Sequence, residues 1–296
     1  MSKKNNFKNF SRLSLLQISI FIGVVMLFIF PMKVSSQENI DKETRPYLKL
    51  TIGLGNYKFK DKVFSPLRYG GTSVPISLQF ESNRNKKLIH NISFFYDNFE
   101  ASSSITRKYD WSANYVNAFS GELNYTIARK VKFSFAKWFS NVYVGLGWKN
   151  FLSVKEYQIT QNESQSSKDF ISSLNIYVRM EKKLNKNSSL IFNLEYAFFA
   201  YIYGRIRHPL DTPNLEDVNQ IYNNISDSGI GNKLNTGDFL TLTSLVQLDS
   251  QIEYRYSLSK RIDFVATYHF RFYQYQKFLL TSVGNSNLLT GIRIKL

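Results

Sequence analysis

Few residues in this chain have side chains that carry acid–base or nucleophilic chemistry. It contains three histidines, His90, His208 and His269, and no cysteine. The lack of cysteine excludes disulfides, thiolate metal sites and a cysteine nucleophile. His208 stands in the sequence IRHPLD with Asp211 nearby and is a candidate general base. Because an Asp–His pair works only when the two side chains touch, the segments that carry them decide its value.

Other chemical motifs are weak. No group of His, Asp and Glu has the spacing of metal ligands, and GLGW at 145–148 is not followed by the helix of a phosphate loop. We therefore expect no metal and no cofactor. The formal net charge of +16 is typical of nucleic-acid binders. However, the basic residues are scattered in short runs, which favours ends that lie near lipid headgroups over a nucleic-acid surface.

Residues 1–36 have the organisation of a secretory signal peptide. A basic start, MSKKNNFKNFSR, is followed by an apolar run at 13–32 and by Val34-Ser35-Ser36. This order predicts export and cleavage after Ser36. The apolar run is also long enough to span a bilayer, so a retained anchor is the alternative. Residues 37–46 would then form a short N-terminal periplasmic segment.

From residue 47 onwards, apolar and polar residues alternate with a period of two. In the last segment Leu288, Ile292 and Ile294 share one side, while Arg293 and Lys295 share the other. This period is typical of strands whose two faces meet different surroundings. Ten such segments occur, at 47–57, 73–81, 87–98, 115–128, 141–154, 170–180, 189–201, 239–256, 261–275 and 287–296.

The connections between these segments carry a second pattern. Even-numbered connections are short and basic, as in SNRNKK, EKKLNKN and SLSKR, whereas odd-numbered ones are mostly longer, up to residues 204–238. A soluble sandwich has no reason to sort its loops by number. A barrel that crosses a membrane does, because its strands run alternately up and down and its two ends differ. Closure of the sheet also pairs every backbone group that lies in lipid.

Residues 47–296 therefore resemble the outer-membrane β-barrel class of Gram-negative bacteria. The last strand is similar to the C-terminal signal read by the barrel-assembly machinery, although Leu296 stands where an aromatic residue is usual. The resemblance implies an all-β, transmembrane, antiparallel up-and-down barrel of about ten strands, with eight or twelve as alternatives. It also implies outer-membrane lipid, the assembly machinery during biogenesis and other outer-membrane proteins as partners, and no nucleic acid.

Alternation assigns charged residues of both signs to the barrel interior. Because an unpaired charge is costly at low dielectric, a nearly balanced set predicts internal ion pairs. A barrel of this size is narrow, so we expect a salt-bridged polar interior that fills the lumen. The same parity places Lys49, Glu81 and Asp97 inside. The expected charge network is Glu122, Arg179, Glu195, Asp249, Glu253, Arg255, Asp263, His269, Arg271, Arg293 and Lys295.

Three functions fit this architecture. The favoured one is a structural, accessory or surface-interaction protein that works through long extracellular loops. A narrow transport pore is the second. A hydrolase or lipid A-modifying enzyme at the barrel rim is the third, with His208 and His269 as its candidate residues. Enzyme activity is not favoured, because His269 points inward between Thr267 and Arg271 and no paired aspartates mark a rim.

Overall fold

The computed structural model describes residues 46–61, 67–84, 87–103, 115–132, 138–158, 164–203, 238–241, 244–276 and 280–296. The predicted signal peptide, most of the predicted N-terminal segment, and His208 lie outside these described residues. No helix within the described ranges is long and apolar enough to cross a membrane. The strands are β1 (Tyr47–Asp61), β2 (Arg68–Ser73), β3 (Ile76–Arg84), β4 (Leu88–Ser103), β5 (Tyr115–Val131), β6 (Asn141–Gln158), β7 (Ser164–Lys183), β8 (Ser188–Tyr203), β9 (Asp238–Thr241), β10 (Leu245–Ser257), β11 (Ile262–Gln276) and β12 (Leu280–Lys295).

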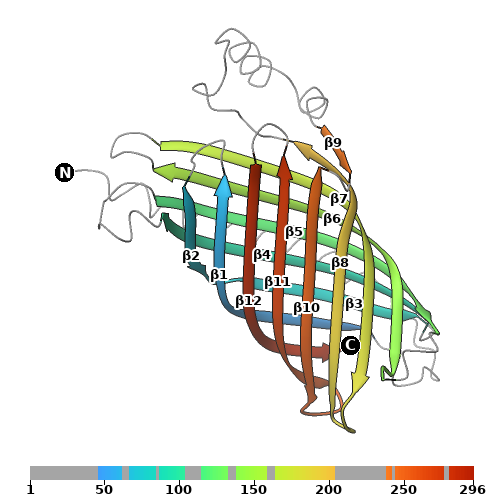
Figure 1. Cartoon of the computed structure of the whole chain (residues 1–296). Helices are drawn as coiled ribbons and strands as arrows, with labels where there is room; N and C mark the ends of the chain where they lie inside the picture. The colour runs from blue at the N-terminus through green and yellow to red at the C-terminus, as the bar shows by residue number, and fades with distance from the viewer. Residues whose placement is uncertain are drawn as a thin grey trace. The chain divides into compact units, whose positions relative to one another are not determined.

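The strands form one antiparallel sheet that closes on itself, because β1 pairs with β12 along its whole length. β2 and β3 both lie between β1 and β4 and form one barrel strand interrupted at Val74-Pro75. β9 and β10 both pair with β8 and form another. Figure 1 shows β10, β11 and β12 side by side in one wall, with β4 to β7 crossing behind it. The resulting ring of ten confirms the predicted all-β barrel.

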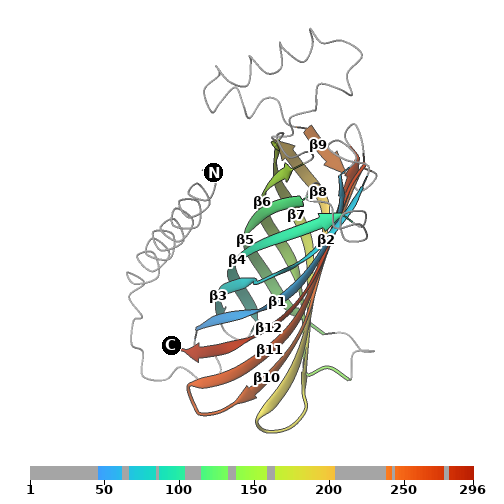
Figure 2. The same ribbon diagram turned by 90° about the vertical axis from the view of Figure 1, so that its left-hand side faces the viewer.

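The two ends of the barrel differ. The connections β3–β4, β5–β6, β7–β8 and β10–β11 lie where β1 begins and β12 ends, which we call the turn end; the opposite end is the loop end. The β7–β8 turn is held by Asn185, whose Oδ1 accepts the backbone N–H groups of Asn187 and Ser188 at 2.9 and 2.7 Å. Figure 2 shows β10, β11, β12 and β1 following one another around the wall.

At the loop end several strands extend further than predicted. β7 begins at Ser164 and β12 at Leu280, whereas the alternation placed their starts at residues 170 and 287. β11 and β12 are joined by residues 277–279 alone, so this connection is an exception to the prediction that odd-numbered connections are mostly longer. The apolar alternation does not reveal the early start of β12, because Ser282, Asn285 and Ser286 interrupt it. The backbone ladder to β1 and β11 nevertheless continues through these residues.

An apolar belt surrounds the half of the barrel nearer the turn end. Its side chains point outward and are between 36% exposed, as for Ile76, and 73% exposed, as for Leu54, in the described part of the chain. A closed sheet with such a surface buries it only against hydrocarbon, since a patch of this size is rare on a soluble monomer. The belt includes Leu50, Ile52, Leu54, Ile76, Ile92, Leu123, Leu146, Trp148, Leu174, Ile176, Ile252, Tyr268, Leu288 and Ile292.

Beyond the belt, toward the loop end, the outward side chains become polar. On β1 they continue as Asn56, Lys58 and Lys60, and on β4 the exposed positions above the belt are Asn98 and Glu100. Charged outward side chains are unfavourable in hydrocarbon and favourable in water or among headgroups. The strands are therefore longer than the roughly 9–11 residues that span a bilayer because the barrel continues past the hydrocarbon.

The inward face of this loop-end part is apolar and aromatic. Tyr57 stacks on Phe99 with ring centroids 3.8 Å apart, and Phe59 stacks on Tyr69 at 5.1 Å. This stretch has the polarity of a water-soluble barrel, with its hydrophobic core inside, and corrects the prediction of a polar interior throughout. The buried cluster comprises Tyr57, Phe59, Tyr69, Phe99, Ala101, Val116, Ala118, Phe151, Tyr157, Ile171, Ala197, Ala200, Ile202, Leu240, Leu245, Tyr273, Tyr275 and Val283.

The predicted facing of side chains is wrong at one place on β8. Leu174 pairs with Phe199 and Asn175 with Ala197, so Phe198 is an extra residue in the ladder. A bulge of this kind moves every following side chain to the other face. Leu240 of β9 pairs with the inward Ala200 and is 8% exposed, whereas a continuous period of two from the outward Val246 would place it outside.

The belt generates a first prediction. Ile176→Arg places a charge on the lipid face and should lower the free energy of unfolding by about 2–4 kcal/mol if Ile176 lies near the bilayer midplane. Urea unfolding of the protein in liposomes measures it. Asn117→Arg is the matched control, because this outward position lies beyond the belt and its register partners are Glu100 and Glu156. Equal destabilisation by both variants would contradict the assigned belt.

Candidate functional site

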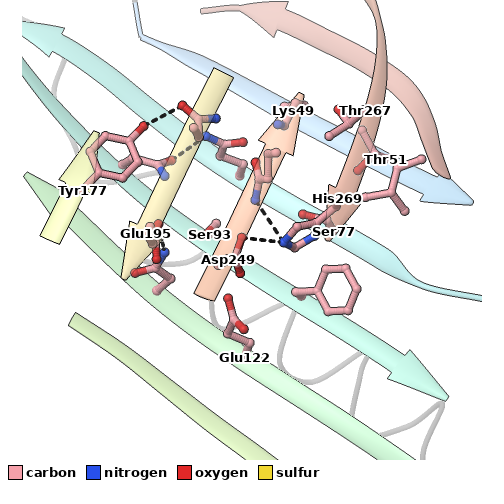
Figure 3. Close-up of a pocket in the computed structure, with 17 residues that line it drawn as sticks. Lys49, Thr51, Ser77, Ser93, Glu122, Tyr177, Glu195, Asp249, Thr267 and His269 are labelled. Carbon is pink, nitrogen blue, oxygen red and sulfur yellow. Dashed lines mark hydrogen bonds and ion pairs between the residues drawn. The ribbon is translucent and has the colours of Figure 1, made fainter. Parts of the chain in front are cut away.

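A lysine at the centre of the interior gathers three carboxylates from three other strands. Lys149 of β6 places its Nζ 2.8 Å from Asp249 of β10, 3.1 Å from Glu195 of β8 and 3.3 Å from Glu122 of β5. Its side chain is 2% exposed. Because the four residues come from separate strands, their ion pairs tie the walls of the barrel together across the lumen. Figure 3 shows the three carboxylates of this cluster, Glu122, Glu195 and Asp249, on different strands.

His269 belongs to the same cluster and is bound on one side by a carboxylate. Its Nε2 lies 2.8 Å from Asp249 Oδ1, and Gln251 Nε2 lies 3.4 Å from the same nitrogen. Phe95 packs edge-on against the ring, with centroids 5.5 Å apart. The cavity beside it has a volume of about 30 Å³, which holds one or two water molecules at most. An Asp–His contact is thus present, but this cavity has no room for an organic substrate.

Arg271 links the central cluster to Asp97. Its Nη1 lies 3.5 Å from Glu122, its Nη2 lies 3.7 Å from Asp97, and its guanidinium carbon lies 3.7 Å from the centroid of the Phe95 ring. Asn285 donates a hydrogen bond of 2.8 Å to Asp97. Stacking of a guanidinium on an aromatic face is favourable when both are desolvated. A second small cavity, about 20 Å³, adjoins this group.

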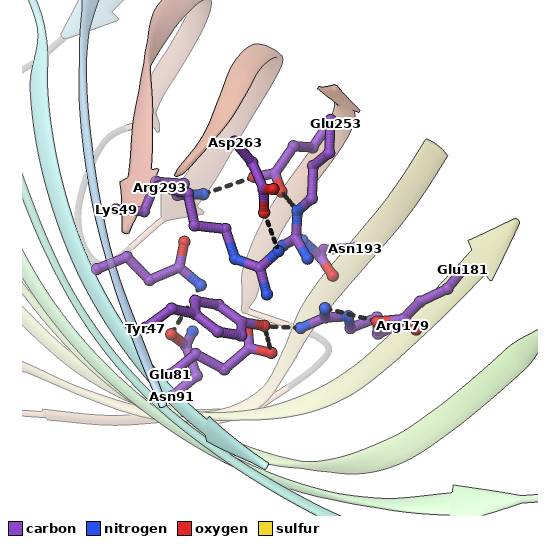
Figure 4. Close-up of polar contacts among 12 residues, drawn as sticks. Tyr47, Lys49, Glu81, Asn91, Arg179, Glu181, Asn193, Glu253, Asp263 and Arg293 are labelled. Atoms are coloured by element: carbon purple, nitrogen blue, oxygen red, sulfur yellow. Dashed lines mark hydrogen bonds and ion pairs between the residues drawn. The ribbon is translucent and has the colours of Figure 1, made fainter. Parts of the chain in front are cut away.

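Toward the turn end a second layer is centred on Arg179. Its two terminal nitrogens lie 2.7 Å from Glu81 and 2.6 Å from Glu181. The Tyr47 hydroxyl donates to the other Glu81 oxygen. Arg179 comes from β7 and Glu81 from β3, so this contact also crosses the interior (Figure 4).

The remaining turn-end charges pair in two groups. Lys49 of β1 lies 2.6 Å from Glu253 of β10, which also contacts Arg255. Asp263 forms ion pairs with Arg293 at 2.9 Å and with Lys295 at 3.1 Å. The β11–β12 register places Asp263 directly opposite Arg293. Arg255, Asp263, Arg293 and Lys295 line an open vestibule of about 760 Å³ at the turn end.

A third group of charges lies within the aromatic cluster at the loop end. Lys155 and Asp169 pair at 2.6 Å, and both side chains have no exposed surface. Tyr275 donates to Asp169 at 3.1 Å, and Tyr157 donates to Asp61 at 3.3 Å. Hydrogen bonds that complete the shell of a buried ion pair offset part of its desolvation cost.

The residues predicted for the network lie on the inward face, and each takes part in a contact described above. The prediction left out Lys149, Lys155, Asp61 and Asp169. The signal for Lys149 was available, because Trp148 and Leu146 face outward and fix its parity. His90 lies on the outer face, where its ring nitrogen meets the Tyr125 hydroxyl at 2.9 Å. In the described part of the chain no cluster of three or more His, Asp and Glu residues is arranged to hold a metal ion.

The geometry decides the class of this protein. The closed antiparallel sheet of this protein has apolar side chains outside and paired ions inside. Barrels of the outer membrane have the same arrangement, because closure pairs every backbone N–H and C=O group and the apolar band contacts lipid. The fold is that of a membrane-spanning β-barrel of the outer-membrane type. No family model matches this barrel protein, and no curated protein matches it.

Solved structures with a similar arrangement of strands are outer-membrane barrels with different roles. The outer-membrane protease OmpT from Escherichia coli has a TM-score of 0.46 at 8% identity, covering 88% of this chain and 100% of its own. The translocator domain of the autotransporter NalP from Neisseria meningitidis scores 0.38 at 9% identity, covering 94% and 98%. Neisserial surface protein A scores 0.34 at 11% identity, covering 85% and 97%.

The central cluster generates a second prediction. Lys149→Met leaves Glu122, Glu195 and Asp249 facing one another without their shared cation and should lower the free energy of unfolding by about 3–5 kcal/mol. Urea unfolding in liposomes measures the change. Adding Glu195→Gln should restore part of the loss, because it removes one of the three negative charges. Lys186→Met, in the exposed β7–β8 turn, is the control. A Lys149→Met protein as stable as the control would contradict the central role of this lysine.

Proposed function

We propose that this barrel does not conduct and that it serves as a structural, accessory or surface-interaction protein through its loop end. The observation that carries the proposal is the filling of the interior. In the described part of the lumen, two cavities between the turn-end vestibule and the aromatic cluster have volumes of about 30 and 20 Å³. Neither is larger than one or two water molecules.

The interior contacts also resist opening. Lys149 joins β6 to three other strands, Lys49 joins β1 to β10, and the pair of Arg179 with Glu81 joins β7 to β3. An ion that crossed the lumen would have to separate such pairs while they are shielded from water, and breaking a buried pair typically costs about 3–5 kcal/mol. An ion would meet such a layer of pairs more than once along the described lumen.

A rigid filled barrel suits the presentation of loops. The loop-end stretch, with its own aromatic core, holds the connections away from the hydrocarbon, and loops on a rigid scaffold commonly carry binding functions. The connection between β8 and β9 runs from residue 204 to residue 237 and includes Ile221-Tyr222. Its mixture of charged and apolar residues fits contact with another protein.

The narrow pore is supported by one feature only, the vestibule of about 760 Å³ at the turn end. Its inner boundary is formed by Arg179, Arg255 and Arg293 with their carboxylate partners. A vestibule of this kind gives access to one end of the lumen without a path through it, so the pore is the weaker candidate.

The proposal is tested first by conductance. The purified full chain, reconstituted in planar bilayers, should give no steady single-channel current in monovalent salt, because the filled interior leaves no continuous water path. Protease protection of the same preparation in liposomes shows that the barrel is inserted. Steady, reproducible current steps from the inserted protein would overturn the proposal and favour the pore.

The role of the loop end is tested by exchange of the long connection. Replacing residues 206–236 by a short Gly-Ser linker should leave the free energy of unfolding unchanged to within about 0.5 kcal/mol, since the strands on either side keep their partners. Proteins that co-purify with the full chain after gentle solubilisation should be lost. Retention of the same partners by the exchanged protein would assign the interaction to another part of the barrel.

A further inference from the structure

A groove runs across the outer wall of the barrel above the apolar belt. It spans β11, β12, β1, β2 and β4 and has a volume of about 1370 Å³. Hydrogen-bond register aligns one row of residues across it, from Phe272 through Gly284, Lys58 and Gly70 to Ser102. The interior network takes no part in this groove, which lies on the opposite face of the same strands.

Two glycines make the floor of the groove low. Gly284 and Gly70 flank Lys58 on either side in the register and carry no side chains. A Cβ placed on Gly284 would have as its nearest neighbour the Lys58 carbonyl oxygen, 4.0 Å away, so the space above this position is open. Phe272 and Tyr115 stand at the two sides of the groove, both partly exposed.

Three cations and one carboxylate, Glu100, line the groove, and two of the cations stand opposite each other. Lys58, Lys60 and Arg68 all point outward, and Lys60 is directly opposite Arg68 in the β1–β2 register. Like charges directly across two strands destabilise the pair unless an anion lies between them. No carboxylate of the described residues forms an ion pair with any of the three. Among the described residues, these three cations therefore have no paired counter-ion.

The position of the groove relative to the belt identifies that counter-ion. Leu54 and Leu288 are exposed belt residues paired in the β1–β12 register, and Lys58 and Gly284 are four residues further along the same strands. A lipid whose acyl chains cover Leu54 and Leu288 therefore brings its headgroup to Lys58. The loop end faces outward in barrels with short periplasmic turns, so this lipid belongs to the outer leaflet.

We propose that this groove binds the phosphorylated sugar headgroup of an outer-leaflet glycolipid. A phosphate lies between Lys60 and Arg68, because a guanidinium forms paired hydrogen bonds with phosphate oxygens and relieves the opposition of the two charges. Lys58 adds a point charge at the same edge. A sugar ring fits over the low floor of Gly70 and Gly284, against the flat apolar face of Phe272 or Tyr115.

The charge requirement is tested with the full chain in nanodiscs of a zwitterionic phospholipid. The probe is an acylated glucosamine disaccharide with two phosphates, compared with its dephosphorylated form, phosphatidylglycerol and inorganic phosphate, and bound lipid is counted by native mass spectrometry. The phosphorylated glycolipid should bind about tenfold more tightly than its dephosphorylated form, as expected for loss of a hydrogen bond to a charged group. Lys60→Gln with Arg68→Gln should remove that difference.

The matched control is Lys186→Gln with Lys260→Gln, two exposed turn-end lysines, which should leave glycolipid binding unchanged. Equal binding of the dephosphorylated glycolipid, or equal loss in the control, would overturn the site. Equal binding of phosphatidylglycerol would overturn the sugar assignment. Displacement of the glycolipid by millimolar inorganic phosphate would show that a free anion is the ligand and would also overturn the proposal.

The shape requirement is tested without changing charge. Gly284→Phe fills the floor of the groove and should weaken glycolipid binding by about tenfold while the barrel still folds, since its Cβ meets no close neighbour. Gly121→Phe is the matched control: this glycine lies on the outer face of β5 within the belt, and a Cβ there meets nothing within 4 Å. Unchanged binding by Gly284→Phe would show that the cations act without a groove and would overturn the proposed seat of the sugar.

Discussion

Pairing of every backbone N–H and C=O group within hydrocarbon is the constraint on which this structure depends. An open sheet has two edges whose polar groups lipid cannot satisfy, so the sheet must close. Here the closure is the ladder between β1 and β12, which continues from Tyr47–Lys295 to Asp61–Thr281. Closure produces two chemically distinct faces, and it confines alternate side chains in a lumen too narrow to hold much water. The ion network follows from that confinement, because charges removed from water need partners.

Apolar side chains face outward near the turn end of the barrel and inward near the loop end. This change shows which part of the outer wall contacts hydrocarbon. Near the turn end Leu50 and Ile52 point outward while Lys49 and Thr51 are buried. Nearer the loop end of the same strand Lys58 points outward, whereas Tyr57 and Phe59 are buried in the aromatic cluster. One backbone ladder runs through both regions. Lipid contact therefore gives way to an aqueous or headgroup layer partway along β1, and the side chains mark the boundary.

The sequence predicted the features that depend on alternation and neighbouring strands. Ten barrel strands, the antiparallel order and the proximity of Asp263 to Arg293 all follow from counting by two and from adjacency. Contacts that form only when the sheet closes could not be predicted from the period of two. The approach of Lys149 to Asp249 joins residues 100 positions apart across the lumen, and no sequence spacing encodes it. Alternation places the Lys149 side chain in the interior, but it does not identify the carboxylates that this lysine contacts.

Two other differences have local causes. The bulge at Phe198 inserts one residue into β8 without a glycine or proline to mark it, so a strict period of two continues with the wrong face. The sequence also does not reveal that apolar side chains move from the outer to the inner face toward the loop end, and the reason is related. Alternation has the same period whichever face is apolar, and the residue at which Tyr57 turns inward and Lys58 outward is set by the thickness of the hydrocarbon and not by local propensity.

The charged interior also has a physical reason that the folded barrel alone does not reveal. A strand with apolar residues at every position would be as hydrophobic as a membrane-spanning helix, whereas alternate polar residues keep each segment well below that level. An outer-membrane chain must cross another membrane and an aqueous compartment before it closes, so its strands need polar residues that closure then buries. Pairing those residues, as Lys149 does with three carboxylates, makes their burial tolerable. On this argument the network is a consequence of delivery through water as much as a support of the finished barrel.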